Sequence, residues 1–154
     1  MANLEKLRAN LEARGFRTAY FPTADEAAAY LDGQIDGKTV GIGGSMTVKE
    51  MGLYPRLAAH NQVGWAWHWE GGALRDAVLT DVYITSANAL AETGEIVNID
   101  GNGNRVSSTL YGHQKVYFLV GVNKVAPDFE AALWRARNVA APKRAQSMGC
   151  RTPC

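Results

Sequence analysis

The chain has 154 residues and a formal net charge of +1 at pH 7. A chain of this length buries about 68 to 70% of its unfolded surface as one domain, without a stabilising disulfide or metal. The small net charge argues against a nucleic-acid partner and against a polybasic membrane-binding segment. We therefore expect one domain over residues 1–154, with a small molecule or another protein as its partner.

Two further absences in the sequence bear on where the protein resides. No stretch approaches the ~20 apolar residues that cross a bilayer, and the polar first residues lack a signal-peptide core. The cysteines, Cys150 and Cys154, lie within the last five residues and do not form a disulfide framework. These features predict a soluble cytoplasmic protein that does not bind membranes.

The first third of the chain begins with a helical pattern. Leu4, Leu7 and Leu11 recur at helical spacing, and Gly15 stands where a left-handed cap would end that helix. Residues 16–21, "FRTAYF", have the composition of a strand.

The next elements are marked by two capping boxes. Thr23 stands three residues before Glu26, which predicts the start of a second helix. A buried strand over residues 39–43 follows, and Thr47 with Glu50 has the same spacing, which predicts a helix beginning at that threonine.

The remaining elements continue the alternation of strands and helices, which predicts an α/β fold with a mainly parallel sheet flanked by helices. Strand-like runs cover 63–69, 82–86, 95–99 and 115–121, a helix is expected over 71–79, and a last helix opens at Pro127 and Asp128 and closes before Pro142.

Polar residues follow four of the predicted strands. In open α/β sheets, ligands bind at the carboxyl ends of the strands, so these residues are the candidates for a binding site for a small anionic metabolite. Backbone N–H groups of the loop "GGSMT" and two cations would hold negative charge, and amides would orient the ligand. The predicted ligand-binding residues are Gly43, Gly44, Ser45, Thr47, Asn88, Asn98, Asn104, Arg105, Asn123 and Lys124.

Several of these segments also have a purely structural interpretation. The loop "GGSMT" lacks the lysine of a P-loop and the third glycine of a dinucleotide fingerprint, so by itself it suits packing as well as binding. The string "DGNGNR" is typical of turns. Trp65, Trp67 and Trp69 alternate as strand residues do, which indicates one shared face. That face would lie in the core or in a subunit interface, with stacking on a ligand as the alternative.

Four blocks, "VGIGGSMTVKEMGL", "DVYITSANALAETGEIVNIDGNGNRVSS", "VYFLVGVNKV" and "RARNVAAPKRAQSMG", occur in order along the chain. Together they resemble the LUD domain, the family named after bacterial lactate utilization proteins. The resemblance implies the α/β fold shared by ribose-5-phosphate isomerase, glucosamine-6-phosphate deaminase (NagB/RpiA) and CoA transferases. It implies a role in a lactate or related 2-hydroxy acid oxidation system, without an established catalytic residue.

The resemblance also implies an iron–sulfur connection. Similar chains continue past "TPC" with a compact run of cysteines suited to an iron–sulfur cluster or zinc, and Cys154 would be the first of that set. A complete cluster is therefore expected only in a longer form of the protein or in a partner subunit. A non-catalytic role in assembling an iron–sulfur oxidation complex stays open.

An enzymatic alternative rests on two carboxylates. The block "SANALAETGEIVN" is similar to a stretch of the sugar-phosphate isomerases that carries a proton-transferring aspartate, but Asn88 stands at that position and is no general base. Glu92 or Glu95 would then have to act as base, or as the nucleophile of CoA transfer. Such a carboxylate is expected to be buried, with a raised pKa.

Overall fold

The structure, a computed structural model, describes residues 2–65 and 79–150. The chain forms two compact units, and it passes from one to the other several times. The three-stranded unit comprises Met1–Ala19, Ala87–Gly101 and Val120–Cys154, and the four-stranded unit comprises Tyr20–Ser86 and Asn102–Leu119.

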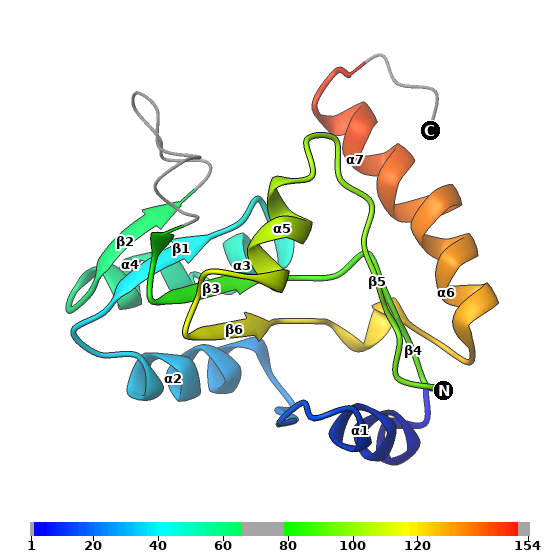
Figure 1. The fold of residues 1–154 in the computed structure, drawn as a ribbon, viewed down its shortest axis with the longest axis horizontal. Helices are drawn as coiled ribbons and strands as arrows, with labels where there is room; N and C mark the ends of the chain where they lie inside the picture. Colours follow the sequence, from blue (N-terminus) through cyan, green and yellow to red (C-terminus); the bar gives the residue numbers. More distant parts are fainter. Residues whose placement is uncertain (1, 66–78, 151–154) are drawn as a thin grey trace. The chain divides into compact units, whose positions relative to one another are not determined.

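The four-stranded unit contains a fully parallel sheet with the strand order β2-β1-β3-β6, visible in Figure 1. The α/β fold class with a mainly parallel sheet flanked by helices is therefore confirmed. The strands are β1 (Thr39–Ile42), β2 (Gln62–Trp65), β3 (Val82–Thr85) and β6 (Lys115–Phe118), and the helices are α2 (Ala24–Gln34), α3 (Met46–Glu50), α4 (Leu53–Ala58) and α5 (Asn104–Leu110).

Alternation along β1 and β3 supplies the core of this unit. Val40 and Ile42 of β1, with Val82 and Ile84 of β3, are at most 5% exposed, and they pack with apolar residues of α2 and α4. These positions alternate along each strand, as side chains on one face of a sheet do. The residues between them on β1 and β3 therefore face the other side of the sheet.

Polar contacts join the beginnings of all four strands. Asp81, just before β3, accepts hydrogen bonds from the Thr39 N–H (3.0 Å) and hydroxyl (2.7 Å) at the start of β1. Its other oxygen accepts from Gln114 (2.9 Å), which immediately precedes β6. Asn61, just before β2, accepts from the Lys38 N–H (2.9 Å). The amino edge of the sheet is thus a continuous structural network.

The three-stranded unit has a mixed sheet of order β5-β4-β7, in which β4 pairs antiparallel with β5 and parallel with β7. Two small apolar clusters form its core. Its elements are α1 (Leu4–Ala13), β4 (Ala89–Ala91), β5 (Ile96–Val97), the 3-10 turn η2 (Val122–Lys124), β7 (Val125–Ala126), α6 (Phe129–Arg135), the π-helix η3 (Ala136–Ala140) and α7 (Ala141–Ser147).

Several expected starts and ends of elements are confirmed. Thr23 caps α2 by accepting from the Glu26 N–H (3.2 Å), and Asp128 caps α6. Gly15 follows α1 with φ of 87°, as a left-handed cap requires. The remainder of the expected strand at 63–69 and nearly all of the helix at 71–79, with Trp67 and Trp69, lie outside the described residues.

Residues 16–21, predicted as a strand, form no strand in the structure. Phe16 is 40% exposed and Tyr20 53% exposed, and no neighbouring strand pairs with this segment. Composition favoured a strand, but a strand forms only where a partner supplies hydrogen bonds and a face to bury. The prediction was wrong for that reason.

Two helix boundaries differ from the expectation. α3 begins at Met46 rather than Thr47, because the buried Ser45 hydroxyl caps it by accepting from the Val48 N–H (3.3 Å). The last helix does not end before Pro142. It continues through η3 into α7 as one rod (Figure 1), and Pro142 lies in the first turn of α7, directly after the π-helix.

The structure also bears on membrane crossing. Among the described residues, no helix combines the length and the apolar character that crossing a membrane requires.

The Asp81 contacts predict an acid-sensitive sheet. The Thr39 N–H, and then its hydroxyl, lower the pKa of Asp81, so its contribution to stability is present above the unfolded pKa and is lost as pH falls through the folded value. We expect Asp81→Asn to be less stable than wild type at neutral pH, with a melting temperature that falls less between about pH 6 and pH 3. Glu130→Gln, which replaces an exposed carboxylate, is the control. The assignment would be contradicted if the melting temperatures of wild type and Asp81→Asn fell equally over this pH range.

Candidate functional site

Gly43 follows β1 at the carboxyl edge of the four-stranded sheet. Its N–H donates to the Ile84 carbonyl (2.9 Å). A Cβ atom at this position would lie 2.5 Å from the Tyr83 hydroxyl and 3.3 Å from the Thr85 hydroxyl. The glycine is therefore required by close packing, which brings two hydroxyl groups of β3 against the end of β1.

Buried hydroxyl groups are concentrated at this edge. The buried polar side chains of the described residues are Ser45, Thr85, Ser86 and Ser108, all at most 5% exposed and all in the four-stranded unit. Thr85 ends β3, Ser86 directly follows it, and Ser45 lies two residues beyond Gly43. The Thr85 hydroxyl donates to the Ser86 carbonyl (3.4 Å), and a hydroxyl can accept as well as donate, so this group of side chains makes the edge polar without adding charge.

The other predicted ligand residues of this unit occupy two segments. Gly44 and Thr47 are half-buried beside Ser45, in the loop and helix that follow β1. Asn104 and Arg105 open α5, also half-buried, and α5 packs against β3, the strand next to β1. Six of the ten predicted residues thus come from segments next to β1 and β3, namely Gly43, Gly44, Ser45, Thr47, Asn104 and Arg105.

Asn88 and Asn98, predicted to orient a ligand, support a hairpin in the three-stranded unit. The Asn88 N–H donates to the Asn98 side-chain oxygen (3.2 Å), and the Ile99 N–H donates to the Asn88 side-chain oxygen (2.9 Å). These reciprocal bonds close the hairpin of β4 and β5. Both amide oxygens are therefore already engaged by backbone groups.

Asn123 and Lys124 also belong to the three-stranded unit, in the η2 turn that follows the expected strand. Asn123 is exposed, and its side-chain oxygen would lie 2.6 Å from a Cβ at Gly121, so the amide folds back over its own turn. Lys124 is half-buried. Their role toward a ligand stays a prediction.

The two candidate catalytic carboxylates hold α1 against the β4–β5 hairpin. Glu92 accepts from the Asn3 N–H (2.8 Å) and lies 3.6 Å from the Lys6 ammonium. Glu95 pairs with Arg14 (2.9 Å). The Thr93 hydroxyl is the main cause of a lowered pKa at Glu95, the opposite of the raised pKa expected for a general acid or base.

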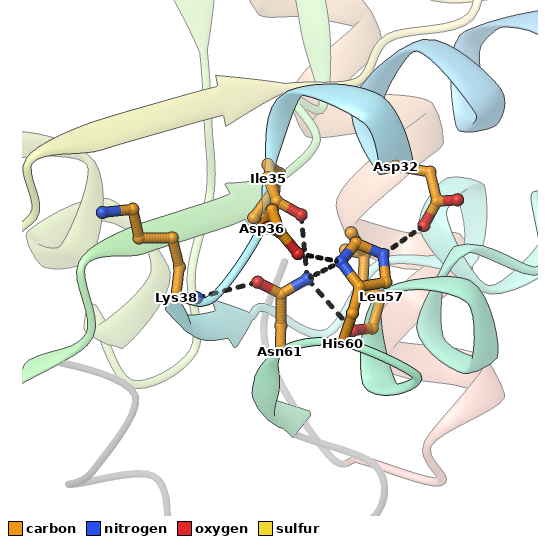
Figure 2. A network of polar contacts seen from close by, with 7 residues as sticks. All are labelled: Asp32, Ile35, Asp36, Lys38, Leu57, His60 and Asn61. Carbon is orange, nitrogen blue, oxygen red and sulfur yellow. Dashed lines mark hydrogen bonds and ion pairs between the residues drawn. The ribbon is translucent and has the colours of Figure 1, made fainter.

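A shallow hollow lies at the amino edge of the four-stranded sheet, which sequence reasoning did not consider. Its volume is about 370 Å³, and its lining includes Lys38, His60, Asn61 and Asp81. Figure 2 shows His60 between two aspartates, with Nε2 2.9 Å from Asp32 and Nδ1 2.9 Å from Asp36, and the Asn61 amide bonded to backbone carbonyls. The signal in the sequence was weak, because aspartates at the end of a helix are common on any surface.

The described residues contain no group of three His, Cys, Asp or Glu side chains placed to hold a metal ion. Cys150 is exposed. Cys154, expected as a single ligand of a larger cluster, lies outside the described residues. The cluster expectation therefore stays a prediction.

Gly43 and Gly33 form a matched pair for testing the close packing at the carboxyl edge. Gly43→Ala should lower the free energy of unfolding by about 1 to 3 kcal/mol, because the fully buried Tyr83 ring cannot move away. Gly33→Ala, in α2 with open space around it, should be neutral or stabilise by up to about 1 kcal/mol. Urea unfolding measures both, and equal midpoints for the two variants would refute the packing constraint.

The His60 contacts predict stability that depends on pH. Hydrogen bonds from His60 to Asp32, and then to Asp36, raise its pKa above 6.5. This contribution is complete below the unfolded pKa and is lost as pH rises through the folded value. His60→Gln should therefore lower the melting temperature more at about pH 5.5 than at about pH 8.5. Asp32→Asn and Asp36→Asn, added to wild type and to His60→Gln, should make the loss in melting temperature equal at the two pH values. If the loss still depends on pH, the aspartates are not its source.

The comparisons with known proteins give one result for the whole chain. The family model of the LUD domain matches residues 4–154, which include both units described above. A comparison with curated proteins found no match, and a comparison with solved structures found none either. A family match over nearly every residue is sufficient for assignment, and the chain therefore belongs to the LUD domain family.

Proposed function

We propose that this LUD-domain protein serves a lactate or related 2-hydroxy acid utilization system and binds a small anionic ligand at the carboxyl edge of its four-stranded sheet. The family supports the metabolic setting. The ligand class is supported by the residues at that edge. In this role the chain works beside iron–sulfur partner subunits that carry out electron transfer.

The observation that carries the proposal is the contrast between the two edges of the sheet. At the amino edge, Thr39, Asp81 and Gln114 bond to one another and join the strands. At the carboxyl edge, Thr85, Ser86 and the Ser45 loop bring together buried hydroxyl groups. Open α/β sheets bind ligands at the carboxyl edge, so we assign ligand recognition to the polar groups of this edge.

A 2-hydroxy acid has the chemistry that this edge offers. Its carboxylate suits a guanidinium, which forms paired, charge-assisted hydrogen bonds, and Arg105 is the predicted arginine at this edge. Its hydroxyl group both donates and accepts, as do the hydroxyls of Thr85 and Ser86. Lactate and pyruvate differ in that one group, so recognition through hydroxyls also provides a means of distinguishing the two.

We assign no catalytic step to the protein. Glu92 and Glu95, the candidates for enzymatic chemistry, are both engaged with α1, through Lys6 and Arg14 respectively. No contact described above favours their reaction with a substrate over this structural role. A binding function is therefore the better supported of the two.

Arg105→Ala tests the proposed site. The loss of a charge-assisted hydrogen bond, worth about 1.5 to 3 kcal/mol, should weaken the binding of L-lactate or pyruvate by roughly 10-fold to 100-fold. Isothermal titration calorimetry on the whole chain measures the dissociation constants. The ligand is chosen first from a thermal-shift series of L-lactate, pyruvate, phosphate, sugar phosphates and CoA thioesters.

The exposed Arg17→Ala provides a matched control, because it removes the same charge from the surface of the other unit. It should leave the dissociation constant unchanged. An unchanged constant for Arg105→Ala, or an equal loss in both variants, would remove Arg105 from the site.

A further inference from the structure

Arg135 is a half-buried cation at the end of α6, directly before the π-helix η3. One guanidinium nitrogen, Nη1, donates to the backbone carbonyl of Asn88. Burial lowers the pKa of Arg135, which means that the protein surroundings solvate its charge less well than water does. π-Helices are rare and often occur at functional sites.

The charge of Arg135 has no counter-ion in the described part of the chain. No ion pair joins it to a carboxylate among residues 2–65 and 79–150, and its described hydrogen bond goes to a neutral carbonyl. A partly desolvated cation without an opposite charge destabilises a fold, and proteins usually provide a partner. The guanidinium has five N–H donors, so most of its hydrogen-bonding capacity is unused by these residues.

Three carboxylates of the same unit are engaged elsewhere. Glu92 is bonded at the start of α1, and Glu95 pairs with Arg14. Asp128 accepts the Ala131 N–H at the other end of α6. The counter-charge for Arg135 is therefore not supplied by these acidic groups.

Arg135 is hydrogen-bonded to a backbone segment that makes further hydrogen bonds of its own. The backbone of Asn88 is held at both ends of the residue, because its N–H donates to Asn98 and its carbonyl accepts from Arg135. The side-chain oxygen of Asn98 is used in this contact, and its NH₂ group has no hydrogen-bond partner among the described residues. The Arg135 guanidinium and the Asn98 side chain are thus both hydrogen-bonded to the backbone of Asn88.

We propose that Arg135 binds the carboxylate of a small organic acid in the three-stranded unit, with the Asn98 amide as a second donor. A carboxylate supplies the missing counter-charge and matches the paired geometry of a guanidinium. This site goes beyond the function proposed above, because it lies in the other unit and does not depend on Arg105.

Arginine-selective modification by phenylglyoxal, followed by peptide mapping of the whole chain, tests this site. The reaction is run with sodium pyruvate, with sodium phosphate, and with sodium chloride at matched ionic strength. Pyruvate at ten times its dissociation constant should slow the modification of Arg135 about 10-fold, since only the unliganded fraction reacts. Arg137, exposed two residues further on, is the internal control and should react at the same rate in all three solutions.

Each other result overturns the inference. Equal protection by chloride would mean simple screening of charge, and stronger protection by phosphate would exclude a carboxylate site. An Arg135 that does not react at all is closed to ligands. The same peptide map also reports on Arg105. Protection of Arg105 alone refutes the site at Arg135 and leaves the proposed function standing. Protection of Arg135 alone supports the site at Arg135 and counts against the proposed function.

Discussion

The carboxylate of Asp81 is the contact on which the four-stranded sheet depends. Parallel strands are joined by long crossovers, so no tight turn sets their alignment. Asp81 accepts from Thr39 at the start of β1 and from Gln114 before β6, and the Thr39 hydroxyl accepts from the Asp81 N–H (2.8 Å). One carboxylate therefore links the amino ends of β1, β3 and β6. A slip of one residue would break these bonds and turn the apolar side chains of β1 and β3 away from the core.

This arrangement gives the amino edge of the sheet a structural role. The amino edge uses its polar groups to align strands, and Asn61 extends the same network to β2. At the carboxyl edge, the buried Ser45 hydroxyl caps a short helix, and the buried Thr85 hydroxyl donates to the Ser86 carbonyl (3.4 Å). The structural role of the amino edge explains why a hollow there is a weak candidate for recognition, although its residues are polar.

In the three-stranded unit, several predicted site residues make structural contacts with their neighbours. Asn88 and Asn98 were predicted as ligand donors, and their amide oxygens close a hairpin. Glu92 and Glu95 were the candidates for the alternative, enzymatic function, and they hold α1. Arg135 opens the block "RARNVAAPKRAQSMG" but was not among the predicted site residues, and no ion pair within the described residues balances its charge. Each of these contacts depends on partner geometry, which a sequence does not contain.

The sequence by itself determined the α/β class, the cap at Thr23, the strand at 39–43 and the membership of the LUD domain family, because these depend on local spacing and on ordered motifs. Tertiary structure alone decided what required a distant partner. Residues 16–21 had a strand composition but no strand beside them, and Ala89–Ala91, which lay in a predicted loop, became β4 because β5 and β7 flank it. The close contact of Gly43 with Tyr83 likewise joins two strands separated by a crossover, and only the folded chain brings them together.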